Sequence, residues 1–125
     1  MRRRARSADG SATVWLLIVV GVVAMACATS LLTGVAIRLR HRAAAAADAA
    51  ALTLAVHALD PPTQACADAR RAAREDHAAL TSCVLRAGVA TVTTSVPAPG
   101  WLGWLGSADG RARAGHITAE PVEPP

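Results

Sequence analysis

Two of the three cysteines are spaced so that they could form a disulfide. Cys66 and Cys83 enclose a short loop, whereas Cys27 lies in a long apolar stretch, where a thiol behaves as a small apolar side chain. If the region with Cys66 and Cys83 is exported, we expect a disulfide that stabilises a small domain by about 3 kcal/mol. If this region is cytosolic, the two residues are free thiols.

The other reactive side chains are scattered along the chain. The four histidines are His41, His57, His77 and His116. No close-spaced ligand pair accompanies Cys66 or Cys83, and the adjacent acidic pair Glu75–Asp76 would point in two directions from a helix. A phosphate-binding loop and the HExxH and GxSxG motifs are absent. We therefore expect a protein that is not an enzyme, with no metal, cofactor or small-molecule substrate.

The positive charge of the chain comes from arginine alone. The 125 residues carry a net charge of +4 and include no lysine, phenylalanine or tyrosine. Without phenylalanine and tyrosine, most of the aromatic platforms that bind single-stranded nucleic acid are missing. The arginines flank the apolar stretch instead of forming one patch, so we interpret them as membrane-edge charges and expect no nucleic-acid partner.

The longest feature of the sequence is the apolar stretch Ser11–Ile37, which contains no charged residue. A helix of about 20 apolar residues crosses a hydrocarbon core of roughly 30 Å, so this stretch is long enough to span a bilayer. Backbone polar groups must be satisfied internally in lipid, which requires a helix. Small residues within it leave room for a second helix: Gly21, Ala24, Ala26, Ala28 and Gly34.

Arginines stand on both sides of this stretch. Those before it are Arg2, Arg3, Arg4 and Arg6, and those after it are Arg38, Arg40 and Arg42. The positive-inside rule then gives only a slight bias toward a cytoplasmic N-terminus. Small residues at Ala24 and Ala26 fit a signal-peptidase site before Cys27, which would release a small secreted protein. Since the apolar run continues to Ile37, we favour a retained anchor over cleavage.

The residues after the apolar stretch favour a helix that ends before two adjacent prolines. No Gly or Pro occurs between Ile37 and Pro61, and alanine dominates, so we predict one continuous helix over residues 12–59. Its alanine-rich half would stand in water or present a smooth surface to partner helices.

The remainder predicts a small head that makes the chain an α+β protein. We expect a second helix over residues 63–79 with Thr63 as its N-cap, a hairpin of strands 80–86 and 89–96, a turn at Asp109–Gly110 and a third strand over 111–118. Cys83 would share a face with Leu85, so that a bond to Cys66 pins the second helix onto the hairpin. The expected organisation is a basic cytoplasmic leader (1–10), a transmembrane helix (11–37), a helical extension (38–60), the αβ head (61–118) and a disordered tail (119–125).

The segment Gly100–Gly106 repeats tryptophan and leucine between turn signals. Its apolar residues are Trp101, Leu102, Trp104 and Leu105. At a loop tip they would form an interface with lipid headgroups or with a partner protein. Alternatively, they fold back over the thin sheet and supply much of its core.

The segment Arg40–Ala55, a basic membrane exit followed by AADAAAL, resembles the TadE/TadG-like proteins. These are pseudopilin-like components of tight-adherence (Flp) pilus and secretion systems. The opening residues 9–15, the two distal cysteines and the ending 110–115 are similar to a short actinobacterial branch, the helicase/secretion-neighbourhood TadE-like proteins. The resemblance implies a membrane protein with an external C-terminal region, a disulfide, and assembly with other pilus or secretion components.

One residue departs from the pattern of processed pilin-like proteins. These proteins are cut after a glycine, and a glutamate five residues further on registers the subunits. Gly10–Ser11 is the matching candidate processing site, but Trp15 stands where that glutamate would be. We therefore expect an accessory component rather than a major fibre subunit.

Overall fold

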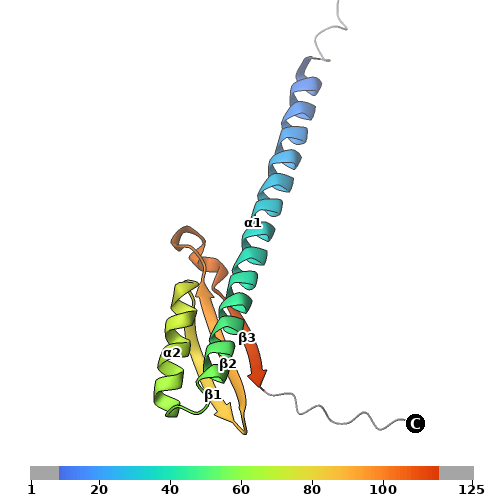
Figure 1. Ribbon diagram of the computed structural model, residues 1–125. Coiled ribbons are helices and arrows are strands. Elements are labelled where there is room, and N and C mark those ends of the chain that lie inside the picture. The colour runs from blue at the N-terminus through green and yellow to red at the C-terminus, as the bar shows by residue number, and fades with distance from the viewer. Residues whose placement is uncertain (1–8, 116–125) are drawn as a thin grey trace, which may run out of the picture. The chain divides into compact units, whose positions relative to one another are not determined.

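The computed structural model describes residues 9–115 and has an α+β fold, as the sequence predicts (Figure 1). Its elements are α1 (Asp9–Val56), α2 (Pro62–Glu75), β1 (Ala79–Arg86), β2 (Val89–Pro97), the 3₁₀ helix η1 (Gly100–Leu105) and β3 (Ser107–Gly115). The chain divides into two compact units, with the boundary between Ala36 and Ile37. We call the second unit the head. The expected basic leader and disordered tail lie largely outside the described residues.

In the first unit, α1 exposes its side chains over residues 10–30. Several hydroxyl groups of this unit are bonded to its own helix. The Thr29 hydroxyl lies 2.9 Å from the carbonyl oxygen of Ala26, and those of Ser30 and Thr33 lie 2.8 Å from carbonyl oxygens four residues earlier. These polar groups are thus satisfied without a partner outside the helix, as lipid requires.

In the head, the alanine-rich part of α1 buries one face against the chain's own sheet. The buried side chains recur every three or four residues, which is the spacing of one helical face: Ala43, Ala46, Ala47, Ala50, Ala51 and Leu54. The prediction of a continuous helix is confirmed, although α1 ends at Val56 and not at residue 59. The expectation that the alanine-rich half stands in water or packs on partner helices was wrong for this face, because its alanines are buried in the chain's own core.

Helix α2 begins with a proline in place of a side-chain cap. Pro61 occupies the N-cap position and makes no side-chain cap bond, while Pro62 lies at N1, where its fixed φ suits a helix. The predicted N-cap role of Thr63 was therefore wrong. Three alanines at a spacing of four, Ala65, Ala69 and Ala73, are buried along one side of α2.

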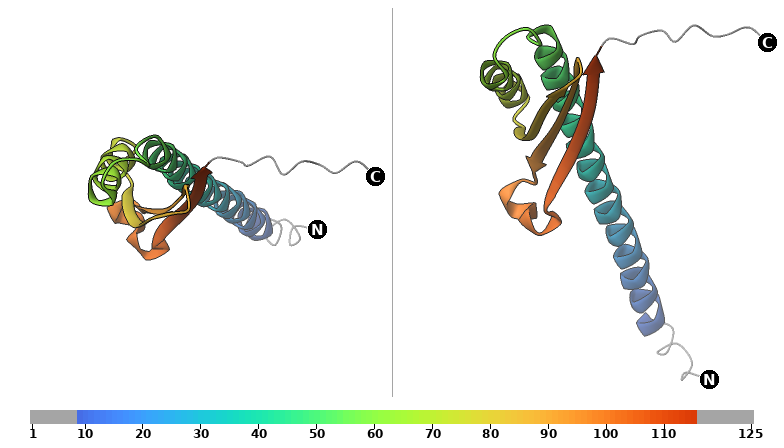
Figure 2. Two further views of the ribbon diagram at one scale, coloured as in Figure 1. Left: turned by 60° about the horizontal axis from the view of Figure 1, so that its bottom comes forward. Right: turned by 90° about the horizontal axis from the view of Figure 1, so that it is seen from below.

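The sheet is antiparallel with strand order β1-β2-β3. Both helices of the head cover one of its faces (Figure 2), and the other face presents side chains such as Thr93 and Arg111. The predicted hairpin is confirmed: Arg86 pairs with Val89 across a two-residue turn. Ala87 and Gly88 both have positive φ, as a type I′ turn requires.

On the face of the sheet that the helices cover, β3 presents small residues. The predicted turn at Asp109–Gly110 was wrong, because both residues pair with β2 inside β3, which runs from Ser107 to Gly115. The predicted third strand thus starts earlier, and residues 116–118 of that prediction lie outside the described residues. Gly110 is needed in the strand because an added Cβ would overlap the backbone of Ala43 in α1.

A buried hydrogen bond joins α1 to the sheet at the same place. Thr94, the partner of Gly110 in the β2–β3 register, is fully buried. Its hydroxyl donates to the carbonyl oxygen of Ala43 at 2.7 Å. The Thr94–Gly110 pair therefore fixes the closest approach of α1 to the sheet, because one residue supplies the bond and the other supplies the space.

Candidate membrane and interaction surfaces

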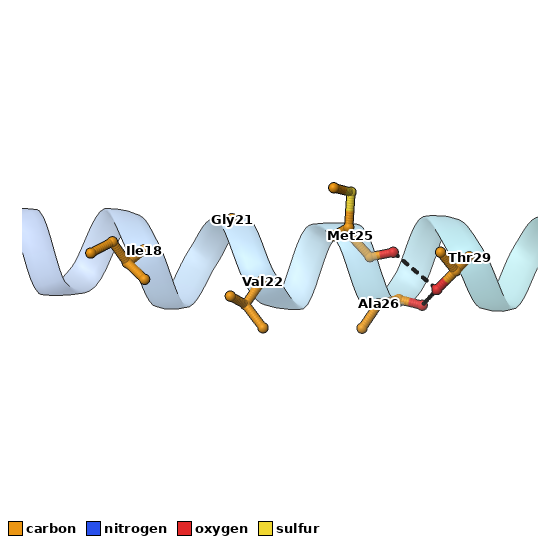
Figure 3. A pocket seen from close by; sticks show the side chains of 6 residues that line it. All are labelled: Ile18, Gly21, Val22, Met25, Ala26 and Thr29. Atoms are coloured by element: carbon orange, nitrogen blue, oxygen red, sulfur yellow. Dashed lines mark hydrogen bonds between the residues drawn. The ribbon is translucent and has the colours of Figure 1, made fainter.

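The first surface is the exposed apolar side of α1 in the first unit. The helix is long and apolar enough to cross a membrane, and it lies near the N-terminus, where a signal sequence has the same features. A shallow groove runs along it (Figure 3) and is lined by Ile18, Gly21, Val22, Met25, Ala26 and Thr29. An added Cβ at Gly21 would meet no atom within 4 Å. The floor of the groove is therefore open to a neighbouring helix.

The candidate processing residues lie at the beginning of α1. Gly10 and Ser11 are exposed, and the Thr13 hydroxyl lies 3.1 Å from the carbonyl oxygen of Gly10. Trp15, at the position of the glutamate in processed pilin-like proteins, is also exposed. The alternative cleavage point after Ala26 lies inside the same helix.

The disulfide between Cys66 and Cys83 is present, and it joins α2 to β1 with a Cα–Cα distance of 6.1 Å. Cys83 and Leu85 pack against the same core, as predicted for one face of β1. A register shift between Leu80 and Ser82 also turns Leu80 inward, although it precedes Cys83 by an odd number of residues. The third cysteine, Cys27, is exposed on α1 in the first unit.

The tryptophan–leucine segment forms η1 between β2 and β3, and its residues differ in exposure. Leu102 is buried, with 3% exposure. Trp101 and Trp104 are 75% and 71% exposed, and Leu105 is 37% exposed. The two tryptophans therefore contribute little to the core, and they form an apolar surface on the outside of the head.

A second groove in the head was not predicted from the sequence. It has a volume of about 750 Å³ and is lined by Leu52, Ala55, Val56, Ala58, Leu59, Gly88, Ala114 and Gly115. The feature of the sequence that indicates this groove is the helical spacing of Leu52, Val56 and Leu59 beside the buried alanine face. These three side chains are exposed.

Chemically, these surfaces are suited to apolar contact. Within residues 9–115, no three His, Cys, Asp or Glu side chains come together in a way that could hold a metal ion. The buried hydrogen bond from the Thr94 hydroxyl to the carbonyl oxygen of Ala43 is structural, because it joins α1 to the sheet. In comparisons with known proteins, no family model, no curated protein and no solved structure matches the chain.

Proposed function

We propose that this protein is a single-pass membrane protein, with a cytoplasmic N-terminus and an external head, that works as a pseudopilin-like accessory component of a Tad/Flp-type pilus or secretion system. The observation that carries the proposal is the division of α1 into two surfaces. Residues 10–30 are exposed and apolar, whereas the part in the head buries an alanine face against a sheet. The resemblance of residues 40–55 to TadE/TadG-like proteins gives the class.

The membrane part of the proposal is supported by the composition of the exposed segment. It contains no charge between Ser11 and Ile37, and the hydroxyls of Thr29, Ser30 and Thr33 bond to the helix itself. Such a helix loses little on entering lipid, because these hydroxyls keep a hydrogen bond when water is removed.

The disulfide supports an external head. Disulfides persist in oxidising compartments outside the cytoplasm and are rare within it. The Cys66–Cys83 bond would therefore be kept if the head follows the apolar helix across the membrane.

Assembly would occur through the groove over Gly21. Small residues at helix interfaces in membranes let two backbones approach closely, which increases van der Waals contact. In the proposed function, a helix of another pilus or secretion component lies in this groove, and the head is displayed on the outer side.

The test is photo-crosslinking in membranes of the native host. A photo-reactive amino acid is placed at Val22, in the groove, or at Val20, about 200° away around the helix. We expect Val22, but not Val20, to give a crosslink to an identified Tad-type component. Gly21→Leu should reduce the crosslink about threefold to tenfold, because a lost packing energy of about 0.6–1.4 kcal/mol corresponds to that change.

The matched control is Val23→Leu, which adds volume on the opposite side of the helix and should leave the crosslink unchanged. An added Cβ at Gly21 meets no atom of the chain itself within 4 Å, so a reduced crosslink in Gly21→Leu reports contact with another molecule. Equal crosslinking from Val20 and Val22, or crosslinks to lipid alone, would contradict assembly through this groove.

A second candidate function, a small secreted protein released near Ala26, is favoured by one observation. Both clusters of buried residues lie beyond Ala36 among the described residues, between Ala43 and Ala112. The head therefore keeps its core and its disulfide if the preceding segment is removed. This protein would act on an envelope or host surface.

A further inference from the structure

The exposed tryptophans lie at a particular end of the head. The last β2–β3 pairs before η1 are Val96 with Ala108 and Pro97 with Ser107. Val96 and Ala108 pack in one cluster with Leu39 and Ala43 of α1. In Figures 1 and 2, η1 is at the end of the sheet beside this start of the head, opposite the Ala87–Gly88 turn. The tryptophans are thus held at the end where the chain enters the head from the apolar helix.

The segment that carries the tryptophans is fixed by its own bonds. The amide of Ala98 donates to the carbonyl oxygen of Gly106 at 3.0 Å, and the amide of Leu102 donates to that of Pro99 at 2.7 Å. Leu102 anchors the segment from within, since it is buried. Two large indole rings are therefore displayed on a supported segment. The conformational entropy of this segment is lost when the head folds and not when the rings bind a partner.

The distance along the chain brings this end of the head near the bilayer surface. From Ile37, the last residue of the charge-free stretch, to Ala43 a helix rises about 9 Å. The headgroup layer on each side of the hydrocarbon core is about 5–7 Å thick. An indole ring that projects from this end of the head can therefore reach the layer.

The charges around this end suit the same environment. Between Pro97 and Ser107 the chain has no charged residue, while Arg38 and Arg40 are exposed on the adjoining turns of α1. Tryptophan is enriched at membrane interfaces because its ring is apolar and its N–H still finds a polar partner. Arginines near the same level are attracted to anionic headgroups.

We propose that Trp101 and Trp104 insert into the headgroup layer of the outer leaflet of the membrane that holds α1, and so tie the head to the bilayer surface. This inference rests on the membrane part of the proposed function. The occupant of the tryptophan surface is lipid, and a protein partner at this surface is an alternative that the test separates.

The test uses the full-length chain reconstituted into vesicles of phosphatidylethanolamine and phosphatidylglycerol. Trp15→Phe removes the background tryptophan, so that the fluorescence reports Trp101 and Trp104. Aqueous iodide and a lipid with a nitroxide on its headgroup are the two quenchers. In the control, Trp15→Phe, Trp101→Ser and Trp104→Ser are combined with Leu59→Trp, which places the only indole at an exposed position near the Ala87–Gly88 end of the head.

We expect iodide to quench Trp101 and Trp104 several-fold less than the Leu59→Trp control, and the headgroup nitroxide to quench them several-fold more. Equal iodide quenching in the two proteins would place η1 in water and overturn the proposal. Protection from both quenchers would indicate a protein contact and would also overturn it. Thiol titration checks that both proteins keep the Cys66–Cys83 bond.

A separate readout distinguishes failure of the underlying function. Vesicles are washed at alkaline pH before the fluorescence is measured, and a chain that spans the bilayer is expected to stay with them. If the wash releases the chain, the membrane part of the proposed function is wrong, and the proposed contact of η1 with lipid is wrong as well. If the chain stays and the tryptophans remain open to iodide, only the contact of η1 with lipid is wrong.

Discussion

Replacing Gly110 by alanine is expected to lower the free energy of unfolding of the head by about 2–3 kcal/mol. An added Cβ at this position overlaps the carbonyl group and the following amide of α1 at Ala43–Ala44, which are backbone atoms and cannot rotate away. The helix must therefore move off the sheet. That movement also stretches the buried bond from Thr94 to Ala43, so two stabilising features are lost together.

Thermal unfolding of the full-length chain in micelles, followed by circular dichroism, measures this effect. For a head of this size, about 2–3 kcal/mol corresponds to a fall in Tm of roughly 8–24 °C. Gly103→Ala is the matched control, because its added Cβ meets no atom within 4 Å and its φ is not positive. Equal melting of the two variants would contradict the close approach of α1 to β3.

Loss of the Cys66–Cys83 bond is expected to destabilise the head by about 3 kcal/mol. The bond closes a loop with a sequence separation of 17, for which the chain-entropy estimate is about 3 kcal/mol. It also holds α2 on β1, where the core consists mostly of alanines that bury little area each. A thin core of this kind depends on a covalent link more than a core of large side chains does.

The measurement compares Cys66→Ala/Cys83→Ala with the unchanged chain in the presence and absence of a reductant. Reductant should lower the Tm of the unchanged chain to that of the double variant and should leave the double variant unaffected. Cys27→Ala is the control, since this thiol is exposed and unbonded, and it should melt like the unchanged chain. A Tm that is the same with and without reductant would show that the disulfide does not stabilise the head.

Much of the fold followed from local sequence signals. The uninterrupted alanine run predicted the continuity of α1, Pro61 and Pro62 predicted the break after it, and the Ala87–Gly88 pair between valine- and threonine-rich segments predicted the hairpin. These signals act within a few residues, through helix propensity, a missing amide or a positive φ. These local signals do not depend on which other segments pack against the element.

The errors arose where a distant segment decides the conformation. Asp109–Gly110 has the composition of a turn, yet it lies inside β3 because Gly110 must leave space for α1, which is more than sixty residues away in the chain. The alanines of α1 have no polar face to mark which side is buried. Their burial depends on the sheet, whose position the sequence of the helix does not encode. Helix propensity alone therefore did not predict that these alanines are buried.

The candidate surfaces were predicted in part. The tryptophan segment was identified from its composition, but the separation of Leu102 from Trp101 and Trp104 depends on the path of η1 over the end of the sheet. The groove beside Leu52, Val56 and Leu59 was missed, although their spacing is helical. Alanine dominates that region of the sequence and obscures the helical spacing of the three larger side chains.

The central claim, a membrane-anchored chain with an exported head, is tested most directly by the intact mass of the protein from its native host. Membrane and medium are analysed separately, without reductant and after alkylation of free thiols. We predict a membrane form that retains the apolar stretch, either full-length or lacking residues 1–10, with one alkylated cysteine and a Cys66–Cys83 disulfide. A form in the medium that starts at Cys27, or a membrane form with all three cysteines alkylated, would contradict it.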